Sequence, residues 1–191
     1  MTPLDPLAAA VFLLAAFTLA GVAQTAWFAS GWSRAFSFPL DGGMCFRGRR
    51  FFGANKTIRG FMVMVPAAAA AFSFLAWLGA DRNAGLWNLS IPAYAVLGAW
   101  AAIGFMVGEL PNSFIKRQLD IAPGDAPRRQ AGAALQFIGD RLDSGIGMLA
   151  AVSVAVPTPA LTWLYVLLIG PAIHWSFSLV LFRLGLKQRA A

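Results

Sequence analysis

The sequence predicts an all-α integral membrane protein with about five transmembrane helices and two large cytoplasmic loops. Hydrophobic residues make up 59% of the 191 residues, and charged residues make up only 12%. A soluble domain has about 25% charged residues, and a soluble core of this size cannot bury so much apolar surface. The apolar residues also form long blocks without a charge. We therefore expect one multi-pass membrane domain over residues 1–191.

The uncharged blocks predict the individual helices. Residues 6–33, 61–80 and 83–108 each suffice for one helix of about 20 residues across about 30 Å of hydrocarbon. The block 144–182 has 39 residues, too many for one span, and Pro157-Thr158-Pro159 divides it because proline continues a helix poorly. The predicted spans are 7–30, 61–80, 91–109, 142–156 and 160–182.

The fourth predicted span, 142–156, is short for a membrane crossing. A re-entrant segment is the alternative at this place, and it would move the C-terminus to the other side of the membrane.

The positions of lysine and arginine predict the orientation. All but one of the 15 basic residues lie in loop 31–60, in loop 109–141 or in the C-terminal tail, and the exception is Arg82. With five spans these segments share one face, which the positive-inside rule makes cytoplasmic. We expect a multi-pass protein of the cell (inner) membrane, with its N-terminus outside and its two large loops and C-terminus in the cytoplasm. The net charge of +7 then reflects membrane topology, and no nucleic-acid partner is expected.

Three carboxylates stand at the ends of the second loop. Glu109 follows a long uncharged run, and Asp140 and Asp143 lie three residues apart, so in a helical turn they share a face. Helix capping and an interfacial charge cluster are one explanation. An acid at the membrane edge is, however, a functional candidate by default, and convergent carboxylates suit Mg²⁺. We therefore expect Glu109, Asp140 and Asp143 to be metal ligands.

Two groups of basic residues are candidates for binding phosphate. Lys116 and Arg117 follow Glu109 by one to two helical turns, either as the basic flank of a span or as phosphate ligands, with arginine as a bidentate fork. The first loop contains FRGRRFFGANKTIRGF, residues 46–61. Its arginines suit topology signals, anionic headgroups or phosphates. Residues 53–60 combine small residues with Asn, Lys and Thr donors, but the spacing of a Walker A motif is absent.

Three ordered motifs carry a family resemblance. Ser113 to Arg117 has the pattern Ser-x-x-Lys-Arg, and Asp140 to Asp143 has the pattern Asp-Arg-hydrophobic-Asp. Residues 46–50 and 53–61 resemble a loop of the form Phe-Arg-Gly-x-Arg…Gly-Asp-Asn-Lys-Thr-x-Arg-Gly-Phe. Together they resemble the CDP-diglyceride synthetase (phosphatidate cytidylyltransferase) family, most closely its short CDP-archaeol synthase branch. The resemblance covers about residues 10 to 185.

The sequence departs from the family pattern at two positions. Glu109 stands where the family usually has aspartate after glycine, and Ala54 stands where the short branch often has aspartate. The His-Gly-Gly run of the larger enzymes is missing between Gln118 and Gly139, which favours the short branch.

The resemblance implies a membrane cytidylyltransferase that makes a CDP-activated lipid from CTP and a lipid phosphate and releases pyrophosphate. Its partners are then CTP, the lipid phosphate and the bilayer, and its cofactor is Mg²⁺. The resemblance implies the catalytic residues Lys116, Arg117, Asp140 and Asp143. The implied nucleotide- and phosphate-binding residues are Arg47, Asn55, Lys56, Thr57, Arg59, Ser113, Lys116 and Arg117.

Two other functions are compatible with the sequence. One is a CTP-dependent kinase of polyprenol or another lipid alcohol, which would release CDP instead of pyrophosphate. The other is a small membrane transporter or scaffold, which would not need acids and a Lys-Arg pair on one face. The sequence leaves open an ether- or ester-linked lipid, the number of metal ions and the oligomeric state, a homodimer included. The single histidine, His174, is expected to make an interhelical hydrogen bond or to sit beside a kink at Pro171.

Overall fold

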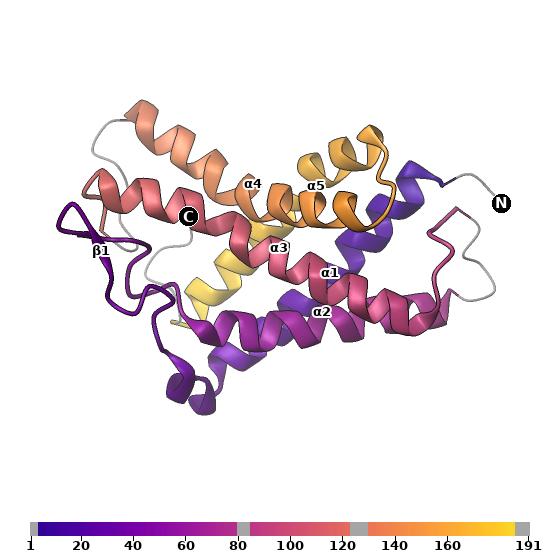
Figure 1. The fold of residues 1–191 in the computed structure, drawn as a ribbon, viewed down its shortest axis with the longest axis horizontal. Helices are drawn as coiled ribbons and strands as arrows, with labels where there is room; N and C mark the ends of the chain where they lie inside the picture. The colour runs from indigo at the N-terminus through magenta and orange to yellow at the C-terminus, as the bar shows by residue number, and fades with distance from the viewer. Residues whose placement is uncertain (1–3, 80–84, 123–129, 186–191) are drawn as a thin grey trace.

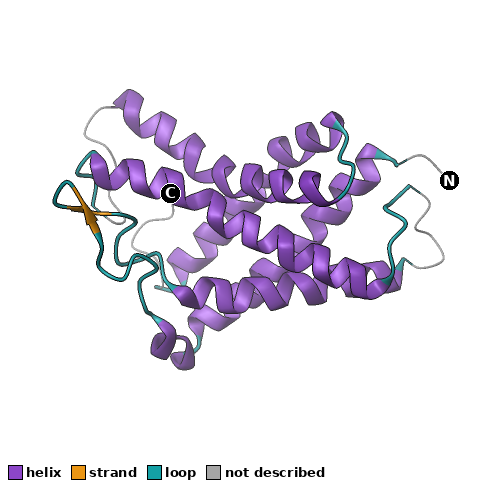
Figure 2. Cartoon of the chain, viewed as in Figure 1, coloured by secondary structure: helices purple, strands orange, loops and turns teal. Residues whose placement is uncertain are grey.

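Five long helices dominate the computed structural model, which describes residues 4–79, 85–122 and 130–185, with only the backbone of 130–138. The elements in chain order are α1 (Pro6–Ala29), the 3-10 helix η1 (Gly31–Phe36), β1 (Cys45–Phe46), β2 (Arg49–Arg50), α2 (Ile58–Leu78), α3 (Ile91–Gln118), α4 (Gln130–Ala155) and α5 (Ala160–Arg183). The strands form one short antiparallel hairpin (Figure 2). The all-α class predicted from the sequence is confirmed.

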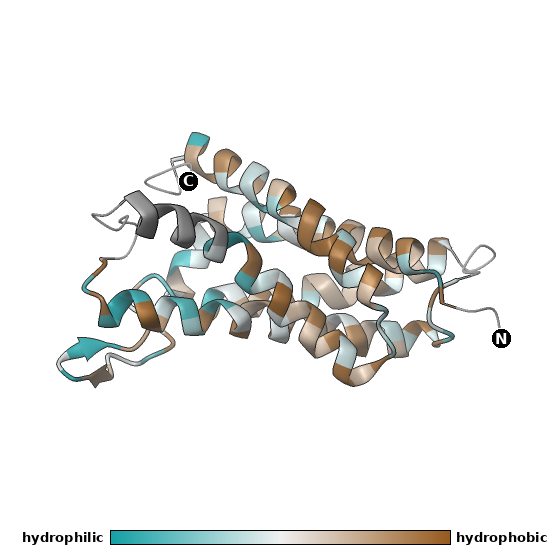
Figure 3. Ribbon diagram, turned by 90° about the horizontal axis from the view of Figure 1, so that it is seen from above, coloured by the Kyte–Doolittle hydropathy of each residue, from teal (hydrophilic) through white to brown (hydrophobic). Residues whose placement is uncertain are grey.

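Successive long helices run in alternating directions between two ends of the molecule (Figure 1). At one end, the Trp87 indole donates to the carbonyl of Pro157 at 2.7 Å, and the Thr162 hydroxyl donates to the carbonyl of Pro6 at 3.1 Å. The hairpin lies at the other end, where hydrophilic residues gather in Figure 3. The loop 31–60, which carries six of the 15 basic residues, therefore meets the end of α3 and the polar part of α4.

Four helices in the described part of the chain, α1, α2, α3 and α5, are long and apolar enough to cross a membrane. The α4 helix differs because the charged residues Asp140, Arg141 and Asp143 interrupt its apolar sequence. Its uncharged part, 144–155, extends only about 18 Å at 1.5 Å per residue, which is less than the about 30 Å of hydrocarbon. The crossing of α4, and the exact limits of all five spans, stay predictions.

The α3 and α4 helices approach closely because glycines face each other. A Cβ atom placed on Gly108 would lie 2.5 Å from the carbonyl oxygen of Asp143, and one on Gly147 would lie 2.3 Å from the carbonyl oxygen of Gly104. Only glycine leaves room for backbones this near, as in membrane helix pairs with a small-xxx-small pattern. This contact brings the turn of Glu109 beside the turn of Asp143.

The second loop is shorter in the structure than predicted from the sequence. The helix α3 does not stop at residue 109 but continues through Pro111 to Gln118, and α4 begins at Gln130 instead of residue 142. Glu109, Lys116, Asp140 and their neighbours therefore lie on helices, where their spacing is fixed. The basic residues Arg128 and Arg129, and Lys187 and Arg189 of the tail, fall outside the described residues.

Candidate active site

The three predicted carboxylates meet where α3 packs on α4. The amide nitrogen of Asn112 lies 2.5 Å from Oδ1 of Asp140 and 2.9 Å from Oδ2 of Asp143, so it donates to both acids. The Ser144 hydroxyl lies 2.9 Å from Oε1 of Glu109 and 3.2 Å from Oδ1 of Asp143. One amide and one hydroxyl thus connect all three acids.

Two lysines complete this cluster. Lys56, from the loop before α2, pairs with Oε2 of Glu109, and Lys116 of α3 pairs with Oδ1 of Asp140. Burial alone would lower the pKa of Lys56, but the carboxylates of Glu109, Asp143 and Asp140 favour its charged form and raise the pKa above its ordinary value. The site therefore places two cations beside its carboxylates.

A buried carboxylate, Asp41, organises the basic loop. Its Oδ2 accepts the backbone N–H groups of Phe52 and Gly53 at 3.1 and 3.0 Å, its Oδ1 accepts that of Gly43 at 3.0 Å, and Arg50 pairs with it. Burial favours the neutral acid, yet these donors outweigh it and hold the pKa of Asp41 well below its usual range. A charged loop is thereby folded around an acid that no motif singled out.

The hairpin is also attached to the end of α3. The ring of Phe114 lies 6.0 Å from that of Phe46 and 5.6 Å from that of Phe51, between centroids. Arg49 donates to the carbonyl of Gln118 and pairs with Asp120. These contacts fix the loop that carries Lys56 relative to the helix that carries Glu109.

The other predicted phosphate ligands of the basic loop have different surroundings. Asn55 is exposed, and Thr57 is buried at the N-terminal end of α2. The guanidinium of Arg59 lies 4.7 Å from the centroid of the Phe28 ring, and that of Arg47 lies 5.2 Å from the centroid of the Phe46 ring. Of the predicted phosphate ligands in this loop, it is Lys56 that forms an ion pair with an acid of the cluster, Glu109.

The predicted residues Ser113 and Arg117 make local contacts on α3. The Ser113 hydroxyl donates to the carbonyl of Glu109 at 2.9 Å, one turn earlier in the helix, and Arg117 donates to the carbonyl of Ile121. Their binding of phosphate stays a prediction.

Sequence reasoning missed Asn112, Ser144 and Asp41. Asn112 and Ser144 were within or beside the matched motifs, and their helical spacing from Glu109 and Asp140 was the available signal. Asp41 lies in an irregular loop, where no periodicity pointed to it.

The donor chemistry of the cluster fits Mg²⁺ that arrives with a nucleotide. Among the described residues no three His, Cys, Asp or Glu side chains are grouped closely enough to hold a metal by themselves. Mg²⁺ is, however, usually bound by one or two carboxylates together with substrate phosphates and water. Asp140 and Asp143, joined through Asn112, supply such a pair.

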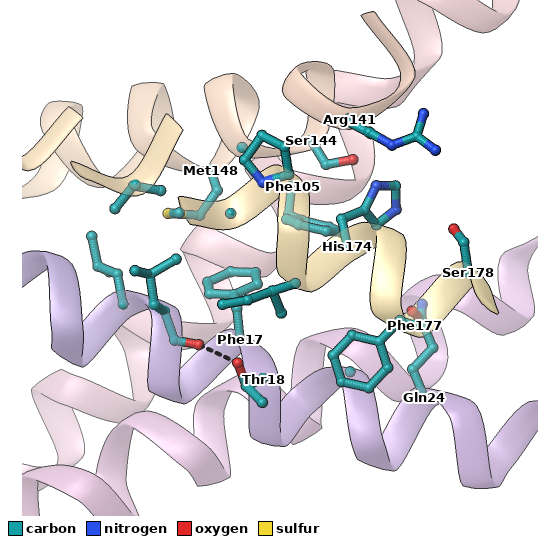
Figure 4. Close-up of a pocket in the computed structure, with 18 of the residues that line it drawn as sticks. Phe17, Thr18, Gln24, Phe105, Arg141, Ser144, Met148, His174, Phe177 and Ser178 are labelled. Atoms are coloured by element: carbon teal, nitrogen blue, oxygen red, sulfur yellow. Dashed lines mark hydrogen bonds between the residues drawn. The ribbon is translucent and has the colours of Figure 1, made fainter. Parts of the chain in front are cut away.

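A pocket adjoins the cluster on the side of α1 and α5. Glu109, Arg141, Ser144 and His174 line one part of it, and mostly apolar side chains from α1, α4 and α5 line the rest (Figure 4).

Comparison with known proteins identifies the family. The family model described as CarS-like, CDP-archaeol synthase, matches residues 8–190. The chain belongs to the CDP-archaeol synthase family. CDP-archaeol synthase of Halobacterium salinarum (strain ATCC 29341 / DSM 671 / R1) is 35% identical over 162 residues, covering 78% of this chain and 81% of that protein. The enzyme of Halorubrum lacusprofundi is 33% identical over 158 residues, covering 78% and 82%.

A solved structure supports the same assignment. It belongs to an intramembrane enzyme for archaeal membrane lipids biosynthesis, with a TM-score of 0.64, 25% identity, and coverage of 91% of this chain and 94% of that chain. The family resemblance inferred from the motifs is confirmed. This CDP-archaeol synthase family member is a multi-pass membrane cytidylyltransferase that depends on CTP and makes a CDP-activated lipid. The kinase and transporter alternatives are set aside. Cytidylyltransferases of the family typically need a divalent metal.

Proposed function

We propose that the protein transfers CMP from CTP to an archaeol-type lipid phosphate at the cytoplasmic face of the cell membrane. The observation that carries this proposal is the contact of α3 with α4, where Glu109, Asp140 and Asp143 meet Lys56 and Lys116. An ether-linked isoprenoid lipid is the proposed substrate because the similar proteins are named CDP-archaeol synthase.

The proposed reaction needs no covalent bond to the protein. A phosphate oxygen of the lipid attacks the α-phosphorus of CTP, and a new P–O–P link forms. The bond from the α-phosphorus to the oxygen bridging to the β-phosphorus breaks, and pyrophosphate leaves with that oxygen. Positioning and charge stabilisation supply most of the catalysis in phosphoryl-type transfers.

The carboxylates are proposed to hold Mg²⁺. Asp140 and Asp143 are the principal ligands, with Glu109 as the third predicted one. When bound, Mg²⁺ would neutralise charge on the triphosphate. Asn112 orients the two aspartates, since its amide donates to both.

The cationic side chains are proposed to hold phosphate oxygens. Lys116 lies beside Asp140 and Lys56 beside Glu109, so both lysines are placed next to the proposed metal ligands. Arg117, Ser113 and the loop residues Arg47, Asn55, Thr57 and Arg59 remain proposed ligands for the outer phosphates. Held cations of this kind stabilise a leaving pyrophosphate.

The orientation in the membrane is proposed from the basic residues. The hairpin loop and the end of α3 would face the cytoplasm, where CTP is found, and the N-terminus would lie outside.

One assay tests the proposal. Purified protein with Mg²⁺ and CTP labelled at the α-phosphate should transfer label to a diether lipid phosphate with two phytanyl chains and release one pyrophosphate per product. The matched diester phosphatidic acid should react at least tenfold more slowly. Equal rates for both lipids would contradict the ether-lipid assignment, and release of CDP would contradict the reaction.

A further inference from the structure

Exposed apolar side chains gather between α1 and α2, at the hairpin end of the molecule. Trp32 of η1 is 83% exposed, and Phe38, two residues after η1, is 65% exposed. Ile58, the first residue of α2, is exposed as well. Figure 1 shows η1 as a short coil that projects from the end of α1. We call Trp32, Phe38 and Ile58 the η1 patch, and exposed apolar groups of this kind mark an interaction surface.

The outward direction of Trp32 is fixed by how η1 packs. A 3-10 helix has three residues per turn, so residues three apart share a face. Ser33 is fully buried and its hydroxyl donates to the carbonyl of Ser30 at 3.0 Å, while the Phe36 ring lies 5.9 Å from the Trp27 ring of α1, between centroids. Since Ser33 and Phe36 form the inner face, Trp32 lies on the outer one. Its exposure is therefore built into the turn.

The η1 patch is joined through the backbone to the segment that carries Lys56. The N–H of Ile58 donates to the carbonyl of Phe38 at 2.9 Å, and the N–H of Leu40 donates to the carbonyl of Lys56 at 2.8 Å. Lys56 in turn pairs with Glu109. Whatever surface holds the η1 patch therefore also fixes the position of Lys56 relative to that surface.

The neighbouring helices indicate that this surface is the membrane. At 1.5 Å per residue the 24 residues of α1 extend about 36 Å, which exceeds the about 30 Å of hydrocarbon, so η1, two residues later, reaches the headgroup layer. Ile58 and Met62, one turn apart on α2, are both exposed, so the patch continues along a helix apolar enough to cross a membrane. Tryptophan is enriched at this level of a bilayer. A lipid surface is therefore the occupant that fits.

We propose that Trp32, Phe38 and Ile58 insert into the headgroup layer on the side of the membrane where the acids lie, and that this insertion sets the depth of Lys56. The inference goes beyond the proposed reaction, since insertion needs no substrate. It gives the basic loop an attachment to lipid, in addition to its attachments to Asp41 and to the end of α3.

The first test measures depth in the membrane and does not depend on activity. Trp32→Cys and Phe38→Cys, each in a Cys45→Ser background, carry a fluorescent label in lipid nanodiscs that hold one protein each. Ala54→Cys is the matched control, because it is exposed in the same loop outside the patch. Nitroxide on the lipid headgroups should quench the labels at 32 and 38 at least fivefold more than the label at 54, and aqueous iodide should show the reverse order.

Two results of this experiment would overturn the proposal. One is quenching at 32 and 38 equal to that at 54 with both reagents, which would place the patch in water. The other is protection from iodide only in nanodiscs that hold two copies, which would assign the patch to contact between protein chains.

The second test concerns the depth of Lys56. Trp32→Gln/Phe38→Gln should leave the melting temperature in detergent unchanged, since both side chains are exposed, but should lower turnover in nanodiscs at least fivefold. Trp32→Tyr/Phe38→Tyr should retain turnover, because tyrosine also favours the interface. Turnover of the glutamine variant equal to that of the wild type would overturn the link between insertion and Lys56.

Discussion

Lys56 and Glu109 form an ion pair across 53 residues of sequence, between the loop before α2 and the C-terminal half of α3. The side chains are only 23% and 20% exposed. Removing one partner of a partly buried pair leaves the other charge uncompensated, which costs more than the pair itself contributes. Loss of either charge is therefore expected to lower the stability of the site as well as to change its net charge.

This pair gives a prediction that separates folding from catalysis. Lys56→Gln should lower the melting temperature in detergent and reduce turnover by about 100-fold, the usual effect of losing one group that stabilises a transition state. The double variant Lys56→Gln/Glu109→Gln should recover the melting temperature but not the turnover. Arg34→Ala, an exposed cation in the same loop, is the control. A double variant with normal turnover would show that Lys56 only neutralises Glu109.

The proposed metal ligands can be tested by titration with Mg²⁺. Asp143→Asn keeps the shape of the side chain but removes its charge, so we expect turnover to vanish at ordinary Mg²⁺ concentrations. Glu109→Asp should be milder, because aspartate is the residue that the family usually has there. Asp120→Asn is the control, since the Asp120 side chain is 67% exposed and pairs with Arg49 at the surface. Turnover as a function of Mg²⁺ concentration is the measurement. A normal curve for Asp143→Asn would remove this residue from the metal site.

The contact between α3 and α4 gives a prediction about packing. Gly108→Ala would place a methyl group 2.5 Å from the carbonyl oxygen of Asp143, so the helices must separate. Overpacking of this kind costs about 1–3 kcal/mol, and the separation should also displace Asp143 from Asn112 and Ser144. We expect a lower melting temperature and at least a tenfold loss of turnover. Gly31→Ala is the control because no atom lies within 4 Å of its added Cβ. Full activity of Gly108→Ala would mean that the site tolerates a wider spacing.

The depressed pKa of Asp41 predicts how the basic loop responds to pH. A group whose folded pKa is lowered stabilises the fold above its unfolded pKa, about 3.9 for aspartate, and loses that contribution as the pH falls through the folded value. Hydrogen exchange at the backbone N–H groups of Phe52 and Gly53, corrected for intrinsic rates, should show constant protection from pH 5 to 7 and a loss below about pH 4. In Asp41→Asn the protection should be low throughout. Protection in the variant equal to that in the wild type would contradict the role of Asp41.

The membrane orientation can be tested with the native cysteine. Cys45 is exposed in the hairpin, and Asn88, exposed between α2 and α3, can be changed to cysteine in a Cys45→Ser background. An impermeant thiol reagent applied to intact cells should label Asn88→Cys but not Cys45. Membranes opened by sonication should label both, which controls for reactivity. Labelling of Cys45 in intact cells would reverse the proposed topology.

Much of the fold could be predicted from uncharged runs, and part of the site from the positions of its acids together with the family motifs. The predicted ranges 7–30 and 160–182 differ from α1 and α5 by at most one residue at either end, because a charge or a proline marks three of these four ends. The extension of α3 past Pro111 was missed, since proline and polar residues suggest a helix end in any local reading. The spacing of Asp140 and Asp143 predicted a shared face. The partners of Asp41 and the pairing of Lys56 with Glu109 depend on how distant segments fold together, which no local pattern encodes.

The order of the segments along the chain has a consequence for biogenesis. Lys56 is synthesised before Glu109, and the acids of α4 come after both. When α3 enters the bilayer, Lys56 is therefore already available to pair with Glu109, while Asp140 and Asp143 have not yet been synthesised. We therefore expect insertion of α3 to depend on the preceding loop and not on α4. A truncated chain that ends before α4 should accordingly integrate into the membrane yet carry out no chemistry.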